Sequence, residues 1–106
     1  MSDTITPKVK RLVEIRFADE ELRKCLVDKS YASRHLGRDA ANRYLYVMHF
    51  VECIDVPSDL ERFAFLDTVA PTENGGAWSV ALHGRTRVVL RPVEGGSAIE
   101  IMEVVA

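Results

Sequence analysis

The chain has 106 residues, 47% of them hydrophobic, and a formal net charge of −2. This length favours one domain, large enough to bury a core without disulfide or metal support. The charge balance excludes a general attraction to nucleic acid, so any anion site has to be local. No apolar run reaches the length of a membrane span or a signal peptide, so we expect a cytoplasmic protein without membrane contact.

Two predicted elements open the chain. Residues 9–17 alternate loosely between apolar and charged side chains, which indicates a β-strand. Asp19 is a good N-cap and is followed by two glutamates that suit the positive end of a helix dipole. We therefore expect a helix that begins at Asp19 and fades near Ser30. The form of the connector that follows, residues 31–36, stays open.

A second helix is predicted over residues 38–54, because apolar side chains recur there every three or four positions. The members of this stripe are Ala41, Tyr44, Leu45, Met48, Val51 and Ile54. Pro57 ends the helix, because proline disfavours helical backbone in the residue before it. Cys25 and Cys53 both fall at apolar positions of helical patterns, and we expect buried free thiols. Residues 63–69 are short and apolar, which fits either a strand or a packed loop.

Residues 77–105 contain three β-rich runs separated by glycine turns, which predicts a β-meander. Directly opposed residues of neighbouring strands share a face of the sheet. Burial of the apolar face therefore places Leu82 opposite Thr86, across a three-residue loop. Such a loop needs one residue at positive φ, and Gly84 adopts it without steric cost.

The same parity extends to the last strand, where Ile99 should oppose Leu90 and Ile101 should oppose Val88. The opposite face then carries a half-polar set of side chains. Its members are Arg87, Val89, Arg91, Glu100, Met102 and Val104. The predicted architecture is α+β: an N-terminal strand and two helices pack on one face of a mainly antiparallel sheet that ends in the meander.

Three short motifs carry a resemblance to a known family. They are Trp78-Ser79-Val80, Thr86-Arg87-Val88-Val89-Leu90-Arg91 and Ile99-Glu100-Ile101-Met102-Glu103. Together with the paired helices, they resemble the RelE/ParE superfamily of toxins from type II toxin–antitoxin systems, and within it the HigB-like branch. HigB-like members cut mRNA on the ribosome, whereas ParE-like members poison gyrase.

The resemblance implies one RelE/ParE-like domain over residues 1–106 that inhibits translation by ribosome-dependent mRNA cleavage. It implies a cognate antitoxin, a small helix-turn-helix protein, as partner, with the ribosome and mRNA as further contacts. The chain departs from the pattern: Val104 and Val105 stand where HigB-like toxins have Tyr and His, Ala81 replaces a common Arg, and Glu103 replaces Asp. The alternative is a non-catalytic binder of the same fold, either a gyrase-directed inhibitor or a decayed toxin that retains antitoxin binding.

Four residues are candidates for catalysis. Arg87 and Arg91 match the family's arginines and would grip phosphate oxygens, because a guanidinium stabilises the negative charge that develops on the phosphorane. The competing interpretation is cross-strand pairing with Glu100. Glu103 is either a catalytic carboxylate or a structural partner at the edge of the core. His83, on the hairpin corner, is either an acid–base group or a solvated turn residue.

Two further groups are candidates for binding. The most basic piece of the chain, Arg34-His35-Arg38 with Arg43 beyond it, is either an RNA or ribosomal contact or a solvated face; Arg85 on the hairpin corner joins this set. The half-apolar surface patch around Val89, Met102 and Val104, on the open face of the sheet, is the candidate antitoxin surface. No metal-ligand spacing, phosphate-binding glycine loop or nucleophile elbow occurs, so we expect no metal and no cofactor.

Overall fold

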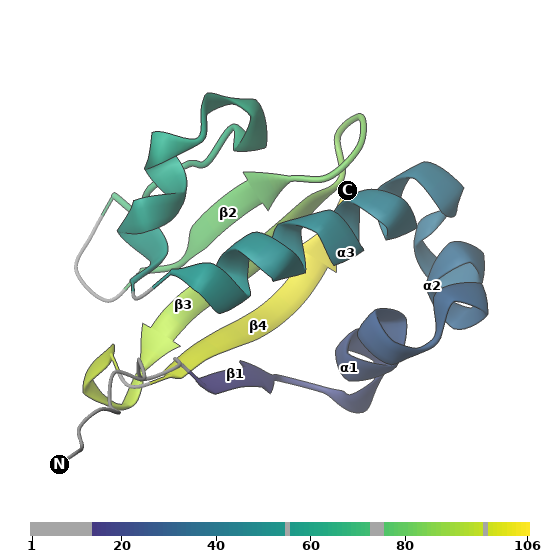
Figure 1. The fold of residues 1–106 in the computed structure, drawn as a ribbon, viewed down its shortest axis with the longest axis horizontal. Helices are drawn as coiled ribbons and strands as arrows, with labels where there is room; N and C mark the ends of the chain where they lie inside the picture. The colour runs from purple at the N-terminus through teal and green to yellow at the C-terminus, as the bar shows by residue number, and fades with distance from the viewer. Residues whose placement is uncertain (1–13, 55, 73–75, 97) are drawn as a thin grey trace, which may run out of the picture.

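The computed structural model describes residues 14–54, 56–72, 76–96 and 98–106. Its elements in chain order (Figure 1) are β1 (Glu14–Phe17), α1 (Glu20–Val27), α2 (Lys29–Leu36), α3 (Arg38–Cys53), the 3₁₀ helices η2 (Pro57–Arg62) and η3 (Ala64–Leu66), β2 (Trp78–Ala81), β3 (Arg87–Val93), the 3₁₀ helix η4 (Glu94–Gly96) and β4 (Ala98–Val105). The helices pack on a four-stranded mixed sheet, which confirms the α+β class. Residues 9–13 of the predicted first strand lie outside the described residues.

The sheet brings the two ends of the chain together. Its strand order is β1-β4-β3-β2, with β1 parallel to β4 and the other two pairs antiparallel. The predicted participation of both terminal strands in one sheet is confirmed, and β4 has a neighbour on each side. Helix α3 crosses one face of this sheet, and α1 and α2 lie beside the N-terminal end of α3 (Figure 1).

The helical layer contains three α-helices where two were predicted. Asp28 separates α1 from α2 by adopting an extended backbone, with φ −127° and ψ 102°. Its backbone N–H closes α1 on the carbonyl of Lys24 at 2.8 Å, and its Oδ1 accepts from the N–H of Tyr31 at 3.1 Å to open α2. The first helix therefore ends before Ser30, and the connector left open at residues 31–36 is the body of α2.

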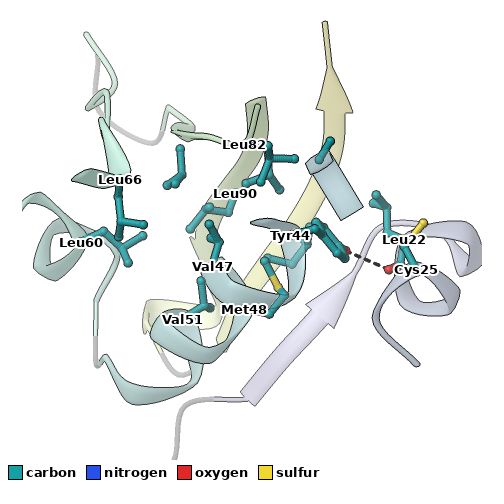
Figure 2. Packing of buried hydrophobic residues seen from close by; sticks show 14 of the residues in the cluster. Leu22, Cys25, Tyr44, Val47, Met48, Val51, Leu60, Leu66, Leu82 and Leu90 are labelled. Carbon is teal, nitrogen blue, oxygen red and sulfur yellow. Dashed lines mark hydrogen bonds between the residues drawn. The ribbon is translucent and has the colours of Figure 1, made fainter. Parts of the chain in front are cut away.

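The predicted stripe of α3 forms the centre of the core (Figure 2). Its residues Ala41, Tyr44, Met48, Val51 and Ile54 are buried, Leu45 is half-buried, and Val47 is buried as well. The Tyr44 hydroxyl donates to the carbonyl of Leu22 at 2.8 Å, which ties α3 to α1. Cys25 is buried as expected, but Cys53 is exposed, because it lies on the face of α3 that points away from the sheet. Both thiols are free.

The register of the β2–β3 hairpin confirms the parity argument. The Leu82 N–H donates to the Thr86 carbonyl at 2.8 Å, and Gly84 has a φ of +60° within the three-residue loop. Val80 pairs with Val88 on the core face, and both side chains are fully buried. On the outer side of β2, Val69 forms an isolated antiparallel bridge with Ser79, so residues 63–69 form a 3₁₀ turn and a packed loop.

The register of β3 with β4 differs from the prediction in two ways. Ile99 opposes Pro92 and Ile101 opposes Leu90, a shift of two residues that keeps both side chains on the predicted face, and a β-bulge lies between Val89 and Leu90. Val89 pairs with Glu103 and Leu90 with Ile101, so Met102 is the extra residue of β4. Ile101 was expected opposite Val88. The bulge reverses the parity of the last three residues of β4, and Val104 now opposes Val88. The reversal lets apolar side chains on both sides of the bulge reach the same core.

Among the described residues, no helix has the length and apolarity needed to cross a bilayer.

Candidate functional site

Arg87 lies on the face of β3 opposite the core, as predicted, but its guanidinium is engaged by the protein itself. Nε donates to Ser79 Oγ at 2.9 Å, Nη1 to Asp67 Oδ2 at 3.1 Å, and Nη2 to the carbonyls of Asp67 and Ser79. Asp67 follows η3 and reaches this position with a left-handed backbone, φ +50°. The Arg87 side chain is only 24% exposed. It connects β3, β2 and the segment after η3.

Arg91 pairs across the strands with Glu100, as one of the two interpretations predicted. Its Nη2 lies 3.1 Å from Glu100 Oε1, and its Nε donates to the same oxygen at 3.2 Å. The side chain of Arg91 is exposed, so this pair contributes under about 1 kcal/mol to stability. Both arginines of the candidate catalytic face therefore have a carboxylate partner within the chain.

Glu103 is exposed, in contrast to the predicted position at the edge of the core. The bulge places it opposite Val89, on the face that carries Arg87 and Arg91. It also borders a pocket of about 240 Å³ between α1, α2 and the end of β4. This pocket is lined by Asp19, Glu21, Leu22, Cys25, His35, Leu36, Glu103 and Val104. Burial, reinforced by Glu21 and Asp19, raises the pKa of the Cys25 thiol, so this cysteine is not poised as a nucleophile.

His83 lies at the tip of the β2–β3 hairpin, near the first turn of α3. Its Nε2 is 3.7 Å from Asp39 Oδ2, and both side chains are more than half exposed. Arg85 is exposed on the same tip and borders neither of the pockets between the helices. The structure therefore separates His83 and Arg85 from the basic residues of α2.

Arg34 and Arg38, two of the predicted RNA-binding residues, border the same open cleft between α2 and the first turns of α3. The cleft has a volume of about 500 Å³ and is lined by Lys29, Ser30, Ser33, Arg34, Arg38 and Asn42. None of these lining residues carries a carboxylate. His35 lies on the other side of α2, where it stacks on Tyr31 with ring centroids 4.0 Å apart, so the predicted basic cluster is divided between two surfaces.

Arg43, the third member of the predicted basic set, belongs to an aromatic cluster formed by α3 and the segment around η3. Its Nη2 donates to the carbonyl of Phe65 at 2.7 Å, and its guanidinium carbon lies 5.4 Å from the ring centroid of Tyr46 and 6.0 Å from that of Phe65. Four rings form the cluster: Tyr46, Phe50, Phe63 and Phe65. Tyr46 and Phe65 are 45% and 50% exposed.

The structure places only part of the candidate antitoxin surface patch on the open face of the sheet. Val89 is half-buried on the open face, and Met102 is half-buried within the bulge. Val104 was expected on this patch, but it packs against the core because the bulge moves its side chain to the opposite face of the sheet. Its place on the open face is taken by Val105, which opposes Arg87 and is 38% exposed.

The geometry supports binding chemistry more directly than proton transfer. Within the described part of the chain, no group of three or more His, Cys, Asp or Glu side chains is arranged to hold a metal. Sequence reasoning missed Asp67 and Lys29, and it did not recognise the aromatic cluster. The spacing of Arg38, Asn42 and Tyr46 at four-residue intervals was the available signal for the surface of α3. Nothing local in the sequence indicated that Asp67 would reach Arg87.

No model of a known protein family, no curated protein and no solved structure matches this chain. Function therefore has to be inferred from the side chains and their placement.

Proposed function

We propose that this chain is a RelE/ParE-like toxin of a type II toxin–antitoxin pair that acts by binding a protein target and does not itself cut mRNA. The order of a strand, a helical layer and an antiparallel three-stranded run supports the proposal. So do the motif residues Trp78-Ser79-Val80 on β2 and Arg87 to Arg91 on β3, which carry the resemblance to the family. The target class that fits this activity is a protein such as gyrase.

The observation that carries the proposal is the internal neutralisation of Arg87. A scissile phosphate would have to displace the Asp67 carboxylate and the Ser79 oxygens before the guanidinium could hold it. The negative charge of Asp67 also cancels most of the positive field at this point of the sheet, because the two charged groups lie 3.1 Å apart. An arginine held in this way stabilises the fold and leaves little charge for a phosphorane.

The free end of β4 is the proposed antitoxin contact. Strand β1 pairs with residues 98–101 of β4 only, so the outer edge of residues 102–105 has no strand beside it in the described part of the chain. Such an edge accepts an extended peptide through main-chain hydrogen bonds. Met102 and Val105 offer apolar surface there, and the carboxylates of Asp19, Glu21 and Glu103 beside it favour a basic segment.

The test is an induction experiment with the wild type, Arg87→Lys and Val105→Asp. We expect growth arrest from all three proteins, because Arg87→Lys retains a cation beside Asp67 and Val105 is at the surface. Co-expression of the protein encoded by the adjacent reading frame should rescue the wild type and fail to rescue Val105→Asp, since the variant loses apolar contact surface and its carboxylate would have to be desolvated beneath the bound segment. Normal growth on strong induction of the wild type would refute the proposal.

A second candidate, ribosome-dependent mRNA cleavage, is favoured by one arrangement on the open face. Arg87 and Arg91 flank Val89 on β3, and Glu103 opposes Val89 from β4, so a carboxylate lies between two arginines. In this candidate Glu103 accepts the proton of the 2′-hydroxyl. Mapping of mRNA ends on translating ribosomes distinguishes the two: new ends that disappear with both Glu103→Gln and Arg87→Lys would select cleavage and overturn the protein-binding proposal.

A further inference from the structure

The cations of this protein fall into two groups according to whether a carboxylate neutralises them. Most arginines that the structure describes form ion pairs within the chain: Arg16, Arg23, Arg62, Arg87 and Arg91. Lys29, Arg34 and Arg38 form none in the described residues, although the chain as a whole is acidic. All three border the same cleft of about 500 Å³, together with two serines and Asn42. A concave surface with three unneutralised cations and hydroxyl donors matches the chemistry of phosphate groups.

The backbone adds to the positive character of this cleft. Helix α3 has 16 residues and begins at Gly37, which supplies no side-chain cap. The first N–H groups of the helix therefore lie beside the cleft without a capping oxygen from residue 37, and the one carboxylate of the first turn, Asp39, is not among the lining residues and lies 3.7 Å from His83 on the hairpin tip. Arg38 and Asn42, in the first turns of the same helix, belong to the lining.

The exposed face of α3 leads from this cleft to the aromatic cluster. Arg38, Asn42 and Tyr46 are spaced at four-residue intervals, so they follow one another along the same side of the helix, each turned about 40° from the one before. With a rise of 1.5 Å per residue, Tyr46 lies about 12 Å along the axis from Arg38. That distance corresponds to about three stacked nucleotides at 3.4 Å per phosphate.

The aromatic cluster presents ring surface held in place by contacts beneath it. Tyr46 and Phe65 are the exposed rings, with centroids 6.1 Å apart, and Phe50 packs against both at 5.2 and 5.5 Å. Arg43 is fixed beside them by its bond to the Phe65 carbonyl, and its buried Nε has no acceptor among the described residues. Arginine beside exposed aromatic rings is the combination on which bases stack.

We propose that this surface binds a single strand of nucleic acid, with phosphates in the cleft of Lys29, Arg34 and Arg38 and bases stacked on Tyr46 and Phe65. The site lies on α2, α3 and η3 and uses none of the residues assigned to the antitoxin contact, because the free end of β4 borders the other side of α2, at His35 and Leu36. A single strand is required because exposed rings can stack only on bases that are not already paired inside a duplex.

The proposal is tested by fluorescence anisotropy with the purified full chain. The probes are a short labelled RNA of mixed sequence, the DNA of the same sequence, and the RNA annealed to its complement. We expect the wild type to bind the RNA or DNA single strand more tightly than the duplex, with an affinity that falls as salt is raised. The difference between the RNA and DNA arms shows whether the 2′-hydroxyl contributes to recognition.

Variants separate the two halves of the surface. The triple variant Lys29→Gln, Arg34→Gln, Arg38→Gln should weaken single-strand binding at least tenfold and reduce the salt slope by about 2, because each phosphate contact contributes about 0.7. Tyr46→Ala should weaken binding about tenfold without changing the salt slope, and Tyr46→Phe should restore it, because stacking needs the ring and not the hydroxyl. These residues are at the surface, so the folded state persists in each variant.

Arg23→Gln is the matched control, because Arg23 is an exposed helical arginine already paired with Glu20. It should leave the affinity within about twofold of the wild type, since a neutralised cation adds little to phosphate binding. Absence of single-strand binding, preference for the duplex, or equal losses from Arg23→Gln and the triple variant would each overturn the proposal. Growth arrest and rescue by the adjacent protein are measured separately, so failure here leaves the protein-binding function untouched, and the reverse also holds.

Discussion

The role of Arg87 illustrates how much the function of one side chain depends on its partners. The motif around it is typical of a phosphate-binding arginine, yet Asp67 and Ser79 engage its Nε, Nη1 and Nη2 groups. The partner carboxylate is 71% exposed, whereas the arginine is mostly covered. The pair therefore fastens a surface loop to the sheet, and residue type alone could not distinguish this role from catalysis.

Tyr44 provides the sharpest prediction at the scale of a residue. Burial raises the pKa of its hydroxyl, and the hydroxyl donates to the Leu22 carbonyl inside the core. Tyr44→Phe should lower the free energy of unfolding at neutral pH by about 1–2 kcal/mol, because the buried carbonyl loses its donor. Urea unfolding followed by circular dichroism measures this difference.

The same pair of proteins tests the pH dependence. The folded-state pKa of Tyr44 is above its unfolded value of about 10, so the unfolded state ionises first as pH rises. The contribution of Tyr44 is therefore complete below pH 10 and is lost above it, by about 1.4 kcal/mol per pH unit. The stability gap between wild type and Tyr44→Phe should shrink above pH 10. A gap that stays constant up to the alkaline limit of folding would contradict the assignment.

At the scale of elements, Asp28 divides the helical layer before α3 into two short helices, α1 and α2. Its extended backbone interrupts the helix, and its carboxylate restarts it by accepting from Tyr31 N–H. The interruption turns Lys29 and Arg34 toward the first turns of α3, where they border the basic cleft. One capping residue thus positions a charged surface.

Replacement of this cap has a measurable consequence. Asp28→Ala should destabilise the protein by about 1 kcal/mol, because the first turn of α2 loses its acceptor. Asp28→Asn keeps a side-chain oxygen and should cost much less. Amide hydrogen exchange should show faster exchange in α2 for Asp28→Ala, with α3 little changed. Equal effects of the alanine and asparagine variants would contradict capping as the cause.

At the same scale, the β-bulge determines which face of the sheet each of the last residues of β4 occupies. By adding Met102, β4 sends Val104 to the core and Glu103 to the open face. A strictly alternating strand would have buried the charged side chain at this end of the sheet. The bulge therefore determines which residues are available to a partner at the free end of β4.

At the scale of the whole molecule, helices and sheet share one core. Side chains from α1, α3, η2 and all three antiparallel strands contribute to the same buried cluster (Figure 2). The chain has one tryptophan, Trp78 on β2, so its fluorescence reports on the sheet, while far-ultraviolet circular dichroism reports mainly on the helices. A shared core implies that both signals change together.

The corresponding prediction is that the two signals give the same urea midpoint, in the wild type and in Ile101→Ala. Ile101 is fully buried in β4, between β1 and β3, so its truncation should lower the free energy of unfolding by about 2–5 kcal/mol and shift both transitions equally. Val105→Ala, at the exposed end of the same strand, is the control and should cost far less. A helical signal that outlasts the tryptophan signal would show separate folding units.

The amino-acid sequence by itself determined the features that depend on neighbours along the chain. The period of the apolar residues placed α3 and its buried stripe, and the alternation around Gly84 determined the hairpin register. The α+β class followed from the order of these local elements. The sequence also identified Arg34 and Arg38 as the most basic surface, because charges cluster there within a few residues.

Only the tertiary structure decided the contacts between residues that are distant in the chain. Asp67 reaches Arg87 across 20 positions, Arg43 reaches Phe65 across 22, and the bulge at Met102 appears only when β4 is fitted against both β3 and the helical layer. The physical reason is that local periodicity sets which side of an element is apolar, whereas the partner of each polar group is chosen by packing. In this protein, packing paired Arg87 of the sheet with Asp67 and left Lys29, Arg34 and Arg38 without an ion pair among the described residues.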